Sequence, residues 1–287
     1  RNKVDQIRKP IFVSPLALYY GNIATLELWR QKVFAAFSKI DPASNGYRDE
    51  HFELYHFNTT AAPLFIMLGL GTRVTGFYEA FGFGWHEEGF RNFEILISIV
   101  HAFVPVAQES ESIFVRLALF LSAREGDIDV ATVNKWMPSP QEFADMERLQ
   151  PVPYFRLLSI YEIPPSGARA FLKLGREDDA YEVSRIAVSP EQKTEKKTTL
   201  VSCHSILGQV AAKRGDLDEA EAHFANALGE AALSRLPMLE VLAARDWKRH
   251  ALVAHGRSGA EADMVIDGAC GKMGKTRKQL GSVLAAS

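Results

Sequence analysis

The stretch SCHSILGQVAAKRGDLDEAEAHFANAL, Ser202 to Leu228, decides the fold of this chain. A helical stretch precedes Gly215 and another follows it. Glycine takes the left-handed conformation just past a helix end without steric cost, and the acidic residues after it suit the first turn of a following helix. The stretch is therefore predicted to be two antiparallel helices joined by a glycine turn.

The same pattern recurs along the chain. A Gly is followed five residues later by an Ala in AREGDIDVA (123–131), LKLGREDDA (172–180) and AKRGDLDEA (212–220), and more loosely in AHGRSGAEA (254–262). The closing alanines lie 49, 40 and 42 residues apart. Such a period indicates stacked helical hairpins, because one hairpin cannot bury its apolar face alone. Each alanine is predicted to lie where two helices cross closely.

Residues 202–228 resemble a tetratricopeptide repeat. The matched positions are Leu207, Gly208, Gly215, Ala220, Phe224 and Ala227. Gly208 and Ala220 admit close helix approach, and Phe224 fills the gap between hairpins. In the preceding copy, Ser184 replaces the usual large apolar residue. Over residues 110–275 the resemblance implies an all-α, right-handed superhelix of paired helices.

The helices must be longer than in the usual repeat of about 34 residues. In SPEQKTEKKTTLVSCHSILGQVAAKRG, Ser189 is a helix cap, Pro190 suits the first helical position and Gln192 completes a capping box. One helix is therefore predicted from this cap to Arg214.

Residues 1–110 lack the repeat signature and are predicted to form a helical N-terminal cap region. A repeat array with a short basic tail follows over residues 111–287. Ser14 precedes a proline and begins a helix in which apolar residues recur near the helical period to Phe37. Ser139 caps a further short helix by the same logic.

The composition is ordinary for a soluble globular protein, with 47% hydrophobic and 24% charged residues. The formal charge of −2 provides no global attraction for nucleic acid or anionic membranes. Cys203 and Cys270 form no disulfide framework or zinc cluster and favour a reducing, intracellular compartment. The longest apolar runs, 61–71 and 93–107, fall short of the ~20 residues that span a bilayer.

ACGKMGKT (269–276) fits a relaxed phosphate-loop pattern. Such a loop follows a buried strand and opens a helix. Here the preceding run, Ala260 to Ala269, has helical alanine spacing, and only eleven residues follow Thr276. We therefore predict a helix end with a glycine turn and no nucleotide site.

Two metal-site patterns are incomplete. FSKIDPASNGYRDEHF (37–52) begins like a calcium-binding EF-hand, but Ala43 and Phe52 stand at its third and twelfth positions, where oxygen ligands are required. His86 has no second His four residues later, as a zinc-protease helix would need. The sequence predicts no metal site and no cofactor.

Cys203 and His204 are adjacent, but neighbours on a helix point about 100° apart. We interpret them as a core cysteine and a surface histidine. No ordering of nucleophile, base and acid suggests catalysis, so the chain is not expected to be an enzyme.

The resemblance implies that the first helix of each hairpin lines a concave groove. The matching positions are Arg169, Lys173, Ser202, Ser205, Gln209, Lys213, Trp247, Ala251 and His255. A groove of Arg, Lys and Gln with an exposed Trp suits an acidic or C-terminal peptide. The alternative remains open that these are ordinary solvated positions and that Trp247 belongs to the core.

The tail after Gly268 carries Lys272, Lys275, Arg277 and Lys278 and no acidic residue. Its local charge near +4 suits an acidic protein surface, RNA or a lipid headgroup. Alternatively, it is a solvated helix end whose lysines complement the helix dipole.

We expect a non-enzymatic adaptor or scaffold that binds a partner protein or peptide. A structural subunit of a large complex, for example in an organelle, is an alternative suggested by the aromatic-rich N-terminal third and the basic tail. An RNA-binding solenoid is a third possibility, which the near-neutral charge disfavours.

Overall fold

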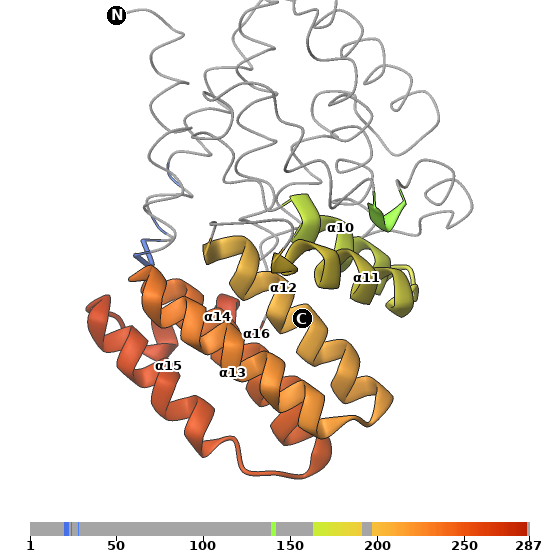
Figure 1. Cartoon of the computed structure of the whole chain (residues 1–287). Helices are drawn as coiled ribbons and strands as arrows, with labels where there is room; N and C mark the ends of the chain where they lie inside the picture. Colours follow the sequence, from blue (N-terminus) through green and yellow to red (C-terminus); the bar gives the residue numbers. More distant parts are fainter. Residues whose placement is uncertain are drawn as a thin grey trace, which may run out of the picture. The chain divides into compact units, whose positions relative to one another are not determined.

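The computed structural model describes residues 20–22, 24, 28, 139–141, 163–190 and 197–285, and every regular element among them is helical. The predicted all-α class is thus confirmed for this part of the chain (Figure 1). The chain divides into two compact units, and the helices below belong to the one that comprises residues 19–21, 137–150 and 162–287. The predicted domain boundary at residue 110 lies outside the described residues, as do the repeat at 123–131, the EF-hand-like stretch and His86.

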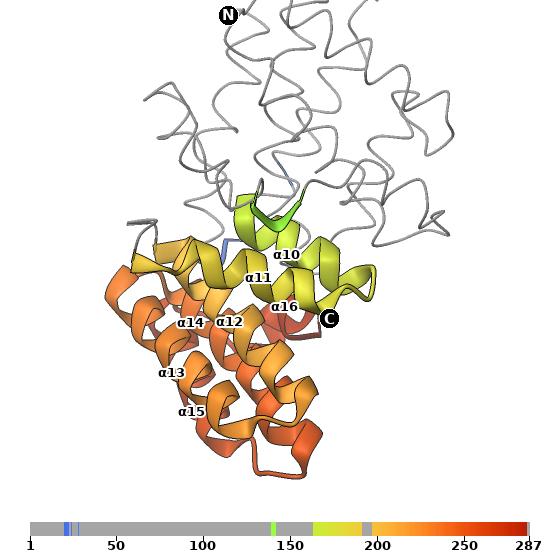
Figure 2. The same ribbon diagram turned by 45° about the vertical axis from the view of Figure 1, so that its right-hand side comes forward.

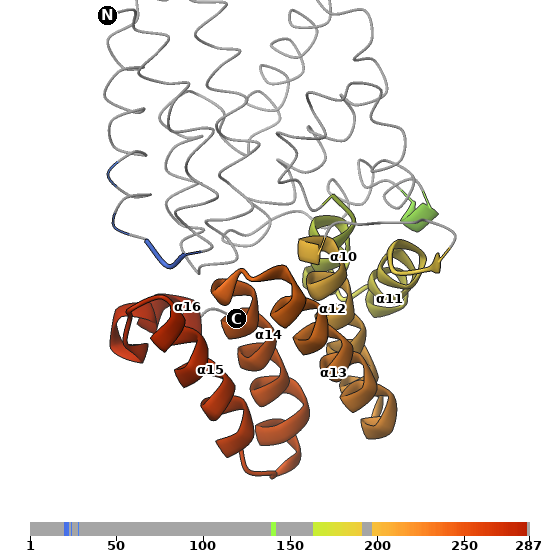
Figure 3. The ribbon, with the colours of Figure 1, turned by 60° about the vertical axis from the view of Figure 1, so that its left-hand side comes forward.

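Three helical hairpins follow one another along the chain (Figures 1 and 3). They are α10 (Ile163–Lys173) with α11 (Glu177–Ala187), α12 (Lys197–Arg214) with α13 (Leu217–Ser234), and α14 (Pro237–Trp247) with α15 (Ala260–Lys272). The helix of α14 continues through the π-helical η2 (Lys248–Leu252) and the 3-10 helical η3 (Val253–His255). The short η4 (Arg277–Leu280) and α16 (Gly281–Ala285) come last.

Four helix ends share one glycine turn. The glycines are Gly175, Gly215, Gly256 and Gly274, with φ between +63° and +82°. At Gly215 the glycine N–H donates to the Ala212 carbonyl at 3.1 Å, and the N–H of Asp216 donates to the Ala211 carbonyl at 3.0 Å. The other three turns repeat this pair of bonds at the same offsets. This is the Schellman motif, which satisfies the last carbonyls of a helix, and it confirms the predicted glycine turns.

The alanines that follow the first three of these turns are fully buried. Ala180, Ala220 and Ala262 each expose 0% of their surface, as the predicted close helix crossings require. Ala220 packs with Ala211 and Ala212 of the facing helix. The predicted end of α12 at Arg214 is also confirmed, whereas its predicted start falls partly on residues that the structure does not describe.

Gly208 lies directly against the Phe224 ring inside the α12–α13 hairpin. A Cβ placed on Gly208 would lie 2.8 Å from the nearest ring carbon. Phe224 is fully buried, and so is Leu207 beside Gly208. The missing side chain of Gly208 therefore leaves space for the Phe224 ring, and this ring fills the space between the two helices at that point.

Alternate helices form a row. Each helix packs on its neighbour in sequence, and the backbone of α12 also approaches those of α10 and α14 closely. In the described part of the chain, the backbones of α11, α13 and α15 make few or no such contacts with one another. Figures 2 and 3 show α12 between the first hairpin and α14. We call α10, α12 and the continuous helix from α14 to η3 the inner row, and α11, α13 and α15 the outer row.

A turn at Tyr20 and Gly21 interrupts the helix that was predicted from Ser14 to Phe37. Gly21 has φ +69°, which ends a right-handed helix. A Cβ on Gly21 would lie 2.9 Å from the Sδ of Met273, so this turn packs against the end of α15. The prediction of one uninterrupted helix is wrong here, because it followed apolar spacing and gave the glycine no weight.

Substituting the two helical glycines of the central hairpin should have opposite effects. Gly208→Ala should lower the free energy of unfolding by about 1–2 kcal/mol, because the new methyl group must displace the Phe224 ring. Gly229→Ala should raise it by roughly 0.5–1 kcal/mol, because alanine is the better helix former and nothing lies within 4 Å of its Cβ. Urea unfolding followed by far-ultraviolet circular dichroism measures both, and a stabilised Gly208→Ala variant would contradict the packing described.

Candidate functional site

The predicted groove residues lie on the inner row. Arg169 and Lys173 belong to α10, Gln209 and Lys213 to α12, Trp247 to α14 and His255 to η3. Lys173, Lys213 and His255 are exposed, and the other three are half-buried. Ser202, Ser205 and Ala251, which share the predicted face, are buried and present no free surface to a ligand.

Trp247 does not present a free ring. Its indole N–H donates to a carboxylate oxygen of Glu221 on α13 at 3.0 Å. Glu221 also pairs with Arg257, which follows the Gly256 turn. The half-buried tryptophan thus joins the α14 helix to the preceding hairpin. Trp247 thus lies between the two alternatives of an exposed groove residue and a core residue.

Lys213 and its neighbour Arg214 tie the end of α12 to the start of α11. The Lys213 ammonium lies 2.7 Å from Glu177, and the Arg214 guanidinium lies 2.6 Å from Asp178. All four side chains are more than a third exposed. Exposed pairs of this kind contribute only about 0–1 kcal/mol each, so a ligand with several carboxylates can compete for these cations.

A basic cluster surrounds the π-helical segment η2. We define it as Lys213, Arg245, Arg249 and His250, with Asp246 as the carboxylate among them. Burial lowers the pKa of His250; Asp246 opposes this shift, and the three cations add to it. Burial and Arg245 also lower the pKa of Arg249. π-helical turns are rare and are frequent at functional sites.

The arginines of this cluster hold the last carbonyl groups of α16. Arg245 donates to Asp246 at 2.7 Å and to the Val283 carbonyl at 3.0 Å. Arg249 donates to the carbonyls of Leu284 and Ala285 at 3.3 and 3.4 Å. The carbonyl end of a helix carries partial negative charge. These bonds join the helix of α14 and η2 to the carbonyl end of α16.

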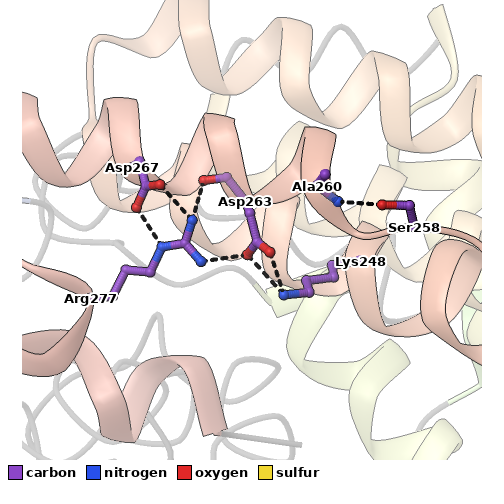
Figure 4. A network of polar contacts seen from close by, with 6 residues as sticks. All are labelled: Lys248, Ser258, Ala260, Asp263, Asp267 and Arg277. Carbon is purple, nitrogen blue, oxygen red and sulfur yellow. Dashed lines mark hydrogen bonds and ion pairs between the residues drawn. The ribbon is translucent and has the colours of Figure 1, made fainter.

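Half of the predicted basic tail is engaged inside the fold. Lys272 contacts both carboxylate oxygens of the buried Glu240 at 2.7 Å. Arg277 binds Asp263 and Asp267 of α15, and Lys248 approaches Asp263 from the other side (Figure 4). The expectation of a free charge near +4 is corrected, because α14 and α15 supply carboxylates that neutralise Lys272 and Arg277.

The two remaining lysines of the tail differ in exposure. Lys275 is half-buried beside the Gly21 turn, and Lys278 is exposed on η4. Neither makes an ion pair within the described residues. Lys275 and Lys278 are therefore the charges of the predicted tail that no carboxylate of the described residues neutralises.

ACGKMGKT is the end of α15 and its glycine turn, as predicted. The helix runs through Lys272, and Gly274 has φ +63°. Thr276 then caps η4 through a reciprocal capping box with Gln279. A helix therefore stands where a phosphate loop requires a strand.

The sequence interpretation missed a pair of facing histidines. His204 of α12 is half-buried, and its Nδ1 lies 3.3 Å from the Nδ1 of His223 on α13. Burial, reinforced by His223, lowers the pKa of His204 to about 4. Cys203 is a core residue as predicted, whereas the surface assignment of His204 is wrong. His204 and His223 lie on opposite sides of the Gly215 turn at similar distances along the sequence. In an antiparallel hairpin such positions face each other, and this spacing is the sequence signal for the contact.

No protein-family model matches the chain, and the searches of curated proteins and of solved structures found no significant match. Within the described residues, no group of three or more His, Cys, Asp or Glu side chains is arranged to hold a metal ion. Among the described helices, none combines the length and the apolar character that a membrane span requires.

The His250 ring should titrate below the ordinary histidine pKa of 6.5, since burial and three cations disfavour its protonation. Asp246→Asn should lower the pKa of His250 further, because it removes the carboxylate that favours the charged ring. Arg249→Gln should raise it. Ring Cε1–H signals followed by NMR from pH 4 to 8, assigned with His250→Gln, test this. A pKa that rises in Asp246→Asn is the contrary result.

Arg277 should fasten the last segment of the described chain to α15. In Arg277→Gln, the amides of residues 277–285 should exchange with solvent faster, because the bonds to Asp263 and Asp267 are lost. Lys278→Gln removes an equal charge from an exposed neighbour and should leave the exchange unchanged. Hydrogen exchange read by mass spectrometry compares the two, and equal rates in both variants would show that Arg277 has no fastening role.

Proposed function

We propose that this chain is a non-enzymatic adaptor that binds an acidic segment of another protein along its inner row. In this proposal the hairpins form a right-handed, tetratricopeptide-like superhelix, and the inner row is its concave side. Binding would bury the partner against a preformed helical surface, without bond chemistry.

The spacing of the two rows supports the proposed curvature. In a curved stack, the helices on the concave side lie closer together than those on the convex side. The backbone of α12 approaches those of α10 and α14, whereas those of α11, α13 and α15 make few or no such contacts with one another. The four similar glycine turns support a repeated unit of the same kind.

The distribution of charge between the rows carries the proposal. In the inner row, α10 contributes Arg169 and Lys173, and α12 contributes Lys197, Lys213 and Arg214, with no acidic residue in either helix. The continuous helix from α14 to η3 has three Arg or Lys residues and two acidic ones. The outer helices are acidic. Helix α11 has four acidic residues and one arginine, and α13 has four acidic residues and no Arg or Lys. Helix α15 has three acidic residues and one lysine.

This sorting gives the unit a basic side and an acidic side, although the formal charge of the whole chain is only −2. An acidic partner would be attracted to the inner row and repelled by the outer one, which orients its approach. The exposed Lys173 and Lys213 would supply the contacts.

The test is binding of a fluorescent twelve-residue peptide of alternating Glu and Leu, measured by anisotropy. The intact chain should bind it, and affinity should fall as salt rises. Lys173→Gln/Lys213→Gln should weaken binding about fivefold or more, as expected from the loss of two contacts of about 0.5–1 kcal/mol each.

The matched control is Arg185→Gln/Arg235→Gln, which removes two exposed arginines from α11 and the end of α13. It should leave the affinity for the acidic peptide within about twofold. A Lys/Leu peptide of the same length should not bind. Equal weakening by both double variants, or tighter binding of a single-stranded RNA dodecamer than of the acidic peptide, would refute the proposed function.

A further inference from the structure

His204 and His223 face each other across the α12–α13 hairpin. Their Nδ1 atoms lie 3.3 Å apart, and their ring centroids lie 5.5 Å apart. Both side chains are half-buried, so the pair remains accessible from solvent. Neither histidine belongs to the inner-row contacts described above.

The opposite edge of the His223 ring faces a carboxylate. Its Nε2 lies 3.7 Å from an oxygen of Glu219, one helical turn earlier on α13. The Tyr181 hydroxyl of α11 donates to the same Glu219 oxygen at 2.7 Å. Glu219 therefore favours the tautomer of His223 that carries its proton on Nε2. In that tautomer the Nδ1 lone pair is directed at His204.

Two nitrogen lone pairs cannot face each other at this distance without a positive centre between them. In the metal-free protein, a proton on the His204 Nδ1 can be this positive centre, because it forms an N–H···N hydrogen bond to the His223 Nδ1. A metal ion can replace that proton. Tetrahedral zinc with nitrogen bonds of about 2.0–2.1 Å places two such ligands about 3.3–3.4 Å apart. The observed separation of 3.3 Å matches this value.

We propose that His204 and His223 bind one divalent late transition-metal ion, Zn²⁺ or its neighbours Cu²⁺ and Ni²⁺, through their Nδ1 atoms. Imidazole nitrogen suits these metals. Glu219 then acts as the outer carboxylate that orients a metal-ligating histidine and increases its basicity. Glu230 exerts its charge on His204 but is paired with Lys197 at 2.5 Å. Water supplies the remaining ligands.

Such an ion would link α12 to α13 beside the Gly208–Phe224 contact. Because it binds the folded hairpin and not the separated helices, it would stabilise the fold in proportion to its concentration. The histidine site shares no residue with the basic cluster, so metal binding and the proposed peptide binding can be tested independently of each other.

The test uses the intact chain without a polyhistidine tag at pH 7.5. Zn²⁺ alone should give a saturable one-to-one isotherm in titration calorimetry and should raise the melting temperature. His204→Gln and His223→Gln should each lose at least about tenfold in affinity and most of the thermal shift. His255→Gln, a change at an exposed histidine of η3, should bind as the parent does.

Glu219→Gln keeps both histidines and should still bind Zn²⁺, with affinity lower by about tenfold, as is typical of a lost outer carboxylate. This variant keeps the proposal testable if a histidine substitution unfolds the hairpin. The absence of saturable binding up to millimolar Zn²⁺ would overturn the proposal, as would unchanged affinity in His204→Gln or loss of binding in His255→Gln.

Discussion

The arrangement of the hairpins depends on the left-handed glycine that ends their first helices. At Gly175, Gly215 and Gly256 the backbone takes a positive φ that costs glycine nothing, and two N–H groups then close back on the preceding turn. The chain leaves each turn almost reversed in direction. At the central turn, the Asp216 side chain accepts from the N–H of Glu219 and starts the next helix at once. An alanine five residues after Gly215 then meets the helix just completed.

The regular reversal also sorts the chain's charge. Because successive helices alternate between two rows, a charge pattern that alternates along the sequence becomes a difference between two sides of the unit. The basic helices α10 and α12 and the acidic helices α11 and α13 illustrate this directly. Ion pairs such as Lys213–Glu177 and Lys197–Glu230 then join one row to the other. Within the described helices, most basic residues thus stand on the inner row and most acidic ones on the outer row.

Local features of the fold could be predicted from the sequence, and contacts across elements could not. The glycine turns, the buried alanines and the end of α12 follow from a few neighbouring residues each. The His204–His223 contact joins residues 19 positions apart on facing helices, and only the antiparallel pairing brings them together. The pairing of Arg277 with α15 likewise needs the direction in which the chain leaves Gly274. In the tail, the four basic residues were visible in the sequence. The carboxylates that form ion pairs with Lys272 and Arg277 could not be predicted from it, because they belong to other helices or to an earlier turn.

Ser184 illustrates another limit of the sequence comparison. The proposed repeat resemblance would place a large apolar residue at this position, and the serine that stands there is fully buried. Its hydroxyl makes no hydrogen bond in the structure, so a small polar side chain lies in the core here. Burial here follows from the register of the turn, not from the side chain.

The burial of Ala251, which was expected on an open face, has a geometric cause in the π-helical segment η2. Residues four apart share a face only while the helix keeps 3.6 residues per turn. In η2 the N–H of Val253 bonds to the carbonyl of Lys248, five residues back, so one extra residue enters that turn. Beyond it the side chains are rotated relative to an uninterrupted α-helix. Ala251 is then buried, and His250 lies close enough to Lys213 of α12 for that cation to lower its pKa. The same π-helical turn therefore contributes both the departure from the expected face and one member of the basic cluster.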